Sequence, residues 1–218
     1  MAKSALAVKA RTQAERRGEA ERRILEASIK LLVERGYDRF TLAEVGERAG
    51  YSRGLPAHYF GKKDDLLSQV AMFIISLYYD AIADTEAVEP GLPRLLARIR
   101  RYIQGYGSSG DRALSVLIAE ARFHATLRRT ITELNQRARA RWQAEVRAGI
   151  ERGNIRPGVD PDAIGSLIHA FVRGQSTFVD MDPGYDVKSA SEGLIDVLLS
   201  KLTPESNRSP GRRAARDA

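Results

Sequence analysis

Residues 40–67 read FTLAEVGERAGYSRGLPAHYFGKKDDLL, and the order of helix signals in this stretch decides the fold. Thr41 is followed three residues later by Glu44, which is the spacing of a capping box. In that motif the hydroxyl accepts a hydrogen bond from the third amide of the helix, and the carboxylate reaches back to the amide of the cap residue. The pattern predicts a short helix that begins after Thr41 and ends near Gly50.

A second helix start follows within a few residues. Ser52 is a preferred N-cap residue and predicts another short helix that continues through Tyr59. Pro56 lies so close to this start that it removes at most one hydrogen bond from the helix. Two short helices joined by a tight turn that contains glycine are typical of a helix-turn-helix unit, whose second helix enters the major groove of DNA.

Helical spacing continues on both sides of this unit, because apolar residues recur every three or four positions and few stretches alternate as strands do. A helix is expected from about Gly18 to Arg35, and a long one from Lys62 or Lys63 to about Asp84. Further helices are expected at about 92–106, 112–124, 127–152, 161–180 and 187–202. The chain is therefore predicted to be all-α, with an N-terminal three-helix domain followed by a larger helical domain.

The composition is that of a soluble globular protein. The 218 residues are 43% hydrophobic and 29% charged, and the absence of cysteine excludes disulfides and catalytic thiols and fits a reducing cytoplasm. The N-terminus lacks the apolar core of a secretory signal. The longest uncharged apolar run, residues 66–79, is 14 residues long and too short for a membrane span.

The positive charge is concentrated in the first quarter of the chain. Of the net charge of +7, residues 1–63 carry +6, from 14 Lys and Arg against 8 Asp and Glu, whereas residues 64–203 carry −1. A basic module attached to a nearly neutral body indicates that the module meets a polyanion while the body has another task.

The second short helix is the candidate reader of DNA. Its exposed residues are expected to include Arg53, Gly54, Ala57, His58 and Tyr59. The guanidinium of an arginine can bind a guanine edge with two hydrogen bonds, and a small residue such as glycine lets the backbone approach the groove closely. Two residues at the N-termini of neighbouring helices suit phosphate oxygens, and these are Thr41 and Lys63.

The stretch 40–67 resembles the signature of the TetR family of bacterial transcriptional repressors. The resemblance implies phosphate contacts by Thr41, Tyr59 and Lys63, and base or groove contacts by Arg53, Gly54, Leu55 and His58. The chain departs from the family pattern at Pro56 and Ala57, where an aliphatic residue and a tyrosine are usual, so the base preference there is expected to differ. Outside residues 20–67 the resemblance is confined to the succession of helices and the loop 152–163.

From these signals we expect a flexible basic arm at 1–19, a DNA-binding domain at 20–63, an effector-binding and dimerisation domain at 64–203, and a disordered basic tail at 204–218. The resemblance implies a small-molecule effector in the body and repression that the effector relieves. The candidate lining groups are aromatic, imidazole and guanidinium side chains, namely Tyr78, Tyr102, Tyr106, Phe123, His124, His169 and Arg173.

The helices expected near the C-terminus, residues 161–202, are apolar on more than one face, which favours a homodimer that binds double-stranded operator DNA with two-fold symmetry. One alternative is a constitutive or architectural DNA-binding protein without effector control. A more remote one is a helical enzyme whose acids and histidines meet only in space. The chain has three histidines and no HExxH, GxSxG, Walker or dinucleotide-binding motif, so we expect no enzyme, no metal and no cofactor.

Overall fold

The computed structural model describes residues 12–204, and within this range every regular element is a helix. The prediction of an all-α chain is confirmed. Along the chain the elements are α1 (Gln13–Arg35), α2 (Leu42–Arg48), α3 (Leu55–Phe60), α4 (Lys63–Ala81), the 3-10 helix η1 (Ala83–Ala87), α5 (Leu92–Gly105), α6 (Ser109–Glu120), α7 (Ala125–Glu151), α8 (Pro161–Met181) and α9 (Val187–Leu202). In this part of the chain no helix is both long and apolar enough to cross a membrane.

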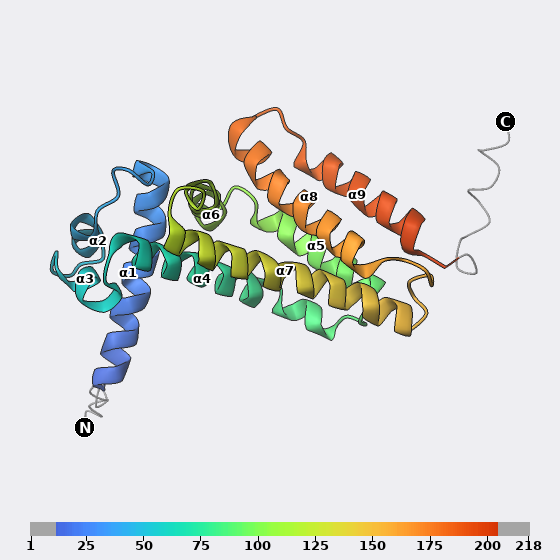
Figure 1. The fold of residues 1–218 in the computed structure, drawn as a ribbon, viewed down its shortest axis with the longest axis horizontal. Coiled ribbons are helices and arrows are strands. Elements are labelled where there is room, and N and C mark those ends of the chain that lie inside the picture. Colours follow the sequence, from blue (N-terminus) through green and yellow to red (C-terminus); the bar gives the residue numbers. More distant parts are fainter. Residues whose placement is uncertain (1–11, 205–218) are drawn as a thin grey trace, which may run out of the picture.

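The molecule is elongated, with the small N-terminal domain at one end. Figure 1 shows α1, α2 and α3 gathered there, while α4 and α7 run from this end into the body, where α5, α8 and α9 lie. One apolar core is shared by the helices α1, α2, α3, α4 and α6 and by the first half of α7. It includes Phe40, Val45 and Leu66. A second core lies farther along the body and includes Leu95, Trp142 and Leu198. The small domain therefore shares its core with the body.

The first helix begins earlier than expected. Thr12 accepts a hydrogen bond from the amide of Glu15 at 3.2 Å and donates its own amide to the Glu15 carboxylate at 2.7 Å. This complete capping box starts α1 at Gln13, five residues before the expected Gly18. Residues 13–19 thus belong to the helix and not to a flexible arm, and the rest of that expected arm, residues 1–11, lies outside the described residues.

The third helix begins later than expected. The side chain of Ser52 does not cap this helix. Instead, the Ser52 carbonyl accepts a hydrogen bond from the Leu55 amide in a turn, at 3.1 Å. The N-cap is Gly54, which leaves Pro56 in the first turn, where the missing amide would have no helical partner. The proline therefore costs α3 no hydrogen bond, and its ring is buried.

The remaining boundaries lie within a few residues of the expected ones. The helix α4 ends at Ala81, and the residues up to Ala87 form η1 instead of its last turn. The helix α6 begins at Ser109, before the expected residue 112, because the Ser108 hydroxyl accepts from the Asp111 amide at 3.2 Å and caps it. The expected tail, residues 204–218, falls outside the described residues except for Pro204.

A buried ion pair joins α5 to α7. Arg98 donates from Nη1 to Oε1 of Glu145 at 2.7 Å, and both side chains are more than nine-tenths buried. The second carboxylate oxygen of Glu145 accepts from the amide of Gly91 at 3.1 Å. Arg98 also donates from Nη2 to Glu86 on η1, and this contact lowers the pKa of the Glu86 carboxyl. The pair fixes the start of α5 and η1 against α7.

Replacing Glu145 with alanine should lower the free energy of unfolding by about 3–5 kcal/mol, because it removes the buried carboxylate that pairs with Arg98 and leaves only the more exposed Glu86 beside that buried guanidinium. The control is Arg147→Ala, also on α7, which breaks the exposed pair of Arg147 with Asp162 on α8. It should cost less than about 1 kcal/mol. Urea unfolding followed by circular dichroism measures both, and equal losses for the two variants would contradict the assignment.

Candidate functional site

The two short helices are held together by a contact that only glycine allows. A β-carbon at Gly46 on α2 would lie 2.5 Å from the carbonyl oxygen of Ser52 and 3.2 Å from the ring of Pro56. In the turn between the helices Gly50 has a φ of +79°, and the amide of Tyr51 donates to the carbonyl of Gly46 at 2.9 Å. These contacts set the angle at which α3 leaves α2.

The helix α3 and the turn before it carry most of the residues that the sequence assigned to DNA. The side chain of Arg53 is 73% exposed, and its Nε lies 3.4 Å from Oε1 of Glu47. Gly54 is exposed, and a β-carbon added there would meet no atom within 4 Å. His58 is exposed one turn later. Leu55 differs from these three, because its half-buried side chain packs against the core and is less available to a groove.

Tyr59 is covered by a residue that sequence reasoning placed in a flexible arm. The guanidinium of Arg17 on α1 lies over the Tyr59 ring, 5.4 Å from its centroid, and Arg17 also pairs with Glu21 at 2.8 Å. The first turns of α1 therefore lie beside α3 and add cations next to it. The capping-box spacing from Thr12 to Glu15 is the sequence signal that could have found this extension.

Thr41 and Lys63 lie at the two helix starts expected for them, but the two side chains differ in exposure. Thr41 is exposed and caps α2 by accepting from the amide of Glu44 at 3.3 Å. Lys63 is half-buried, since its Nζ donates to the carbonyl of Tyr37 at 2.5 Å and lies 3.9 Å from the centroid of the Tyr37 ring. Burial lowers the pKa of Lys63. Its neighbour Lys62 is exposed, and sequence reasoning assigned it no contact.

His124 lies at the junction of the small domain and the body, away from the expected effector site. Its Nδ1 is 2.9 Å from the hydroxyl of Tyr37 and 3.4 Å from the carboxylate of Asp64. The Tyr37 hydroxyl donates to Asp64 at 2.6 Å, and burial followed by this hydrogen bond raises the pKa of Tyr37. Phe123 also lies outside the expected site, because it is 80% exposed in the α6–α7 connection.

The three candidate tyrosines of the body lie together, with Tyr102 buried and Tyr78 and Tyr106 half-buried, and all three are engaged with protein groups. The rings of Tyr78 and Tyr102 stack with centroids 5.7 Å apart, and the Tyr78 hydroxyl donates to Asp111 at 3.2 Å. The Tyr106 hydroxyl donates to the carbonyl of Val172 at 3.1 Å. Burial is the main cause of a raised pKa in each of these tyrosines. They form one wall of the interior between α4, α5 and α8.

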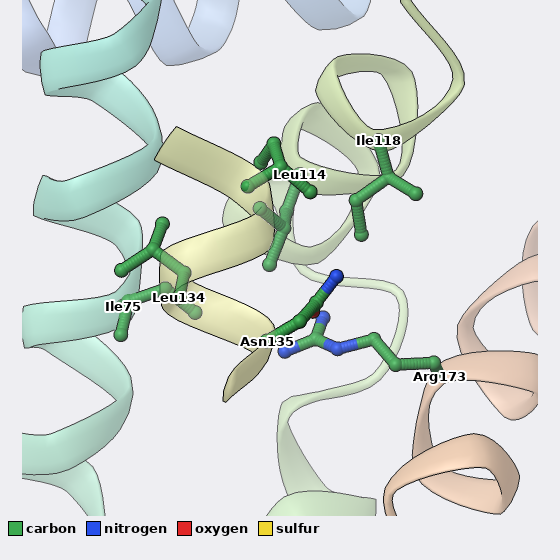
Figure 2. Close-up of a pocket in the computed structure, with 7 residues that line it drawn as sticks. Ile75, Leu114, Ile118, Leu134, Asn135 and Arg173 are labelled. Atoms are coloured by element: carbon green, nitrogen blue, oxygen red, sulfur yellow. The ribbon is translucent and has the colours of Figure 1, made fainter. Parts of the chain in front are cut away.

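A hollow lies where α4, α6, α7 and α8 meet, and its empty volume is about 210 Å³. Figure 2 shows the guanidinium of Arg173 reaching from α8 to Asn135 on α7, with aliphatic side chains around them. Of the seven expected effector contacts only Arg173 lines this hollow. His169 does not line it but contacts Asn135, which does. The lining residues are Ile75, Leu114, Ile118, Ile131, Leu134, Asn135 and Arg173.

His169 is held in its neutral form beside the hollow. Its Nε2 is 3.2 Å from Oδ1 of Asn135. Burial, followed by the positive charge of Arg173, lowers the pKa of His169 to about 4. Residues 12–204 contain no group of three or more acidic or histidine side chains arranged to hold a metal ion. The hollow therefore offers a cation, an amide and aliphatic surface.

Comparison with known proteins extends the sequence resemblance to residues 24–186. The profile described as "Bacterial regulatory proteins, tetR family" matches residues 24–70, and the profile "Tetracyclin repressor-like, C-terminal domain" matches residues 71–186. An uncharacterized HTH-type transcriptional regulator from Mycobacterium tuberculosis is 32% identical over 126 residues, which cover 56% of this chain and 63% of that protein.

Two solved structures share the fold. A transcriptional regulator from Saccharomonospora viridis in complex with choline aligns with a TM-score of 0.74 and 20% identity, covering 86% of this chain and 99% of that one. The regulator FadR from Bacillus subtilis in complex with stearoyl-CoA aligns with a TM-score of 0.69 and 21% identity, covering 82% and 97%.

The close contact at Gly46 predicts a specific stability effect. Gly46→Ala should lower the free energy of unfolding by about 1–3 kcal/mol, because the new methyl group meets backbone that must move. Gly54→Ala is the matched control, since the site is open, and it should change stability by less than about 0.5 kcal/mol. Urea denaturation measures both, and a Gly46→Ala protein as stable as the wild type would show that the helices can separate freely.

Proposed function

Because the chain belongs to the TetR family of bacterial regulatory proteins, we propose that it is a transcriptional regulator that binds operator DNA through α3 and is released by a small molecule bound in its body. The observation that carries the proposal is the exposed face of α3 with the cations that flank it. The match to the mycobacterial relative spans 63% of that protein, and the family profiles extend over both domains of this chain.

Arg53 is the residue proposed to read a base. Its only ion pair in the described residues is the exposed one with Glu47, at 3.4 Å, and exposed pairs contribute little to stability. Exchanging Glu47 for a guanine edge therefore costs little and gains two directed hydrogen bonds in the groove. Gly54 and His58 lie on the same face and complete the surface that enters the groove. Pro56 is buried, so it shapes α3 without touching DNA.

Phosphate contacts are proposed for residues that surround the exposed face of α3. Thr41 at the start of α2, Tyr59 with Arg17 beside it, and Lys63 at the start of α4 surround the reading face. Such contacts fix the register of the protein on DNA without selecting a sequence. The ammonium of Lys63 is also tied to Tyr37, so its contribution includes the placement of the loop that carries Tyr37.

A second copy of this chain is the proposed partner of α8 and α9. Large apolar side chains remain exposed on both helices, and they are Leu167, Phe178, Met181, Val197 and Leu199. Exposed apolar surface of this extent marks an interaction site. A two-fold dimer presents two α3 helices to successive major grooves, about 34–36 Å or a multiple apart, which requires a pseudo-palindromic operator.

The helix α4 is proposed to carry the effect of the ligand to DNA. Its first residues, Lys63 and Asp64, contact the Tyr37 loop, and Ile75 near its other end lines the hollow. An occupant that displaces Ile75 shifts a stiff helix whose start touches the small domain. Such a shift changes the separation of the two α3 helices in a dimer and weakens the fit to one half-site.

Arg53→Ala should weaken operator binding by about 1–3 kcal/mol and relax the preference at one base position, whereas Lys63→Ala should weaken all sequences alike and lower the salt slope by about one unit. Selection of bound fragments from random DNA first identifies the operator, and fluorescence anisotropy then measures each variant at several salt concentrations. Arg152→Ala, at the far end of α7, is the control. An equal loss on every sequence for Arg53→Ala would refute its base-reading role.

The double variant Phe178→Glu with Val197→Glu should convert the dimer into monomers, because it places charges in the proposed apolar interface. Phe123→Glu changes an even more exposed aromatic residue outside that surface and should leave the dimer intact. Sedimentation equilibrium at micromolar concentration distinguishes the two states. A wild-type protein that is monomeric both alone and with operator would contradict the proposal.

A further inference from the structure

We propose that the effector is a small organic anion with an apolar body, whose carboxylate pairs with Arg173 in the hollow between α4, α6, α7 and α8. This inference rests on the proposed function, because it names the chemical class of the molecule that would release the regulator. It is carried by a half-buried arginine whose Nε is buried without a hydrogen-bond partner and whose guanidinium has no counter-charge among residues 12–204.

Arg173 is the only charged residue that lines the hollow. Its Nε is fully buried and has no hydrogen-bond partner, and among residues 12–204 no carboxylate forms an ion pair with its guanidinium. An arginine side chain stays protonated in proteins, so it cannot escape the cost of burial by losing its proton. The buried Nε–H needs an acceptor, and the described part of the chain does not supply one.

The buried carboxylates of the described residues are already committed. Asp111 accepts from the Ser176 hydroxyl at 2.5 Å, from the Tyr78 hydroxyl at 3.2 Å and from the Gly107 amide at 3.0 Å. Glu145 belongs to the ion pair with Arg98 in the other core. Neither can turn toward Arg173 without leaving its own donors unsatisfied, and buried donors without acceptors are costly.

The groups beside Arg173 favour an anion over other ligands. Asn135 uses its Oδ1 for His169, which leaves its amide nitrogen as a donor toward the hollow. His169 is neutral at physiological pH, so it adds no second charge. One guanidinium and one amide donor match a single carboxylate, and a cationic ligand would meet the positive charge of Arg173.

The rest of the lining limits the body of the ligand. The other five lining side chains are aliphatic and offer no hydrogen bond, and they are Ile75, Leu114, Ile118, Ile131 and Leu134. Part of the empty volume of about 210 Å³ is open to solvent, so the enclosed space is small. The occupant is therefore small, and entering this tight space pushes Ile75 on α4, the helix that reaches the small domain.

Isothermal titration calorimetry of the full-length protein without DNA tests the inference with pairs of probes that share an apolar body. The probes are octanoate with octanamide, benzoate with benzamide, and octyltrimethylammonium as a cation. We expect at least one anion to bind about ten-fold or more tightly than its amide, and the cation to bind no better than octanamide. Equal affinity within both pairs, or no anion bound at millimolar concentration, would overturn the inference.

Arg173→Gln should lower the affinity for the anion about ten-fold or more and leave the affinity for the matching amide within about two-fold. Arg173→Lys keeps the charge and should retain part of the binding. Arg152→Gln, an exposed arginine at the end of α7, is the control and should bind like the wild type. If Arg173→Gln does not fold by circular dichroism, the wild-type comparison and Arg173→Lys still decide. Unchanged anion binding in a folded Arg173→Gln protein would refute the role of the guanidinium.

Operator binding is measured separately by anisotropy, with and without the anion that binds. A protein that binds its operator but none of the anions contradicts the inference and leaves the DNA-binding proposal intact. A protein that binds an anion but binds no DNA sequence selectively contradicts the DNA-binding proposal and leaves the anion site intact. When both hold, the anion should weaken operator binding, and saturating operator should weaken anion binding by the same factor.

Discussion

The burial of Leu66, Leu67 and Val70 on α4 is the constraint on which the rest of the structure depends. All three side chains are fully inaccessible in the core that the small domain shares with the body. A helix-turn-helix of two short helices buries too little apolar surface to be stable alone, and α4 supplies the missing wall. The small domain therefore cannot change its position independently of α4, and this dependence makes control by a distant ligand physically reasonable.

Two arginines of the body show how the same side chain serves stability or binding according to its partner. Arg98 is buried against Glu145 and Glu86, and its charge is balanced within the fold. Arg173 is half-buried beside Asn135 and aliphatic residues, its buried Nε has no partner, and its charge has no such balance among the described residues. The first arrangement holds α5 on α7. The second is a local cost that a regulator can retain if an incoming anion relieves it.

Local signals predicted most of this TetR-family chain, and long-range contacts account for what they missed. The expected helix at 187–202 has the observed bounds of α9, because its cap and its apolar spacing are both local. Thr41 caps α2 as expected. Ser52 fails as a cap because Gly54 and Pro56 offer a later start, and the cap at Thr12 was overlooked. His124 meets Tyr37 across 87 residues of sequence, a contact that no periodicity encodes, and it lies at the junction of the small domain and the body; its role as an effector contact stays a prediction.

The position of Trp142 gives the body an optical signal that the small domain lacks. It is the single tryptophan of the chain, and it is buried in the second core with its ring 5.4 Å from that of Tyr102. The small domain has no tryptophan, so indole emission reports the packing of α5 and α7 alone, while far-ultraviolet dichroism reports all helices. Coincidence of the two signals during denaturation would mean one cooperative unit, and separation would mean that the DNA-binding end melts while the body remains folded.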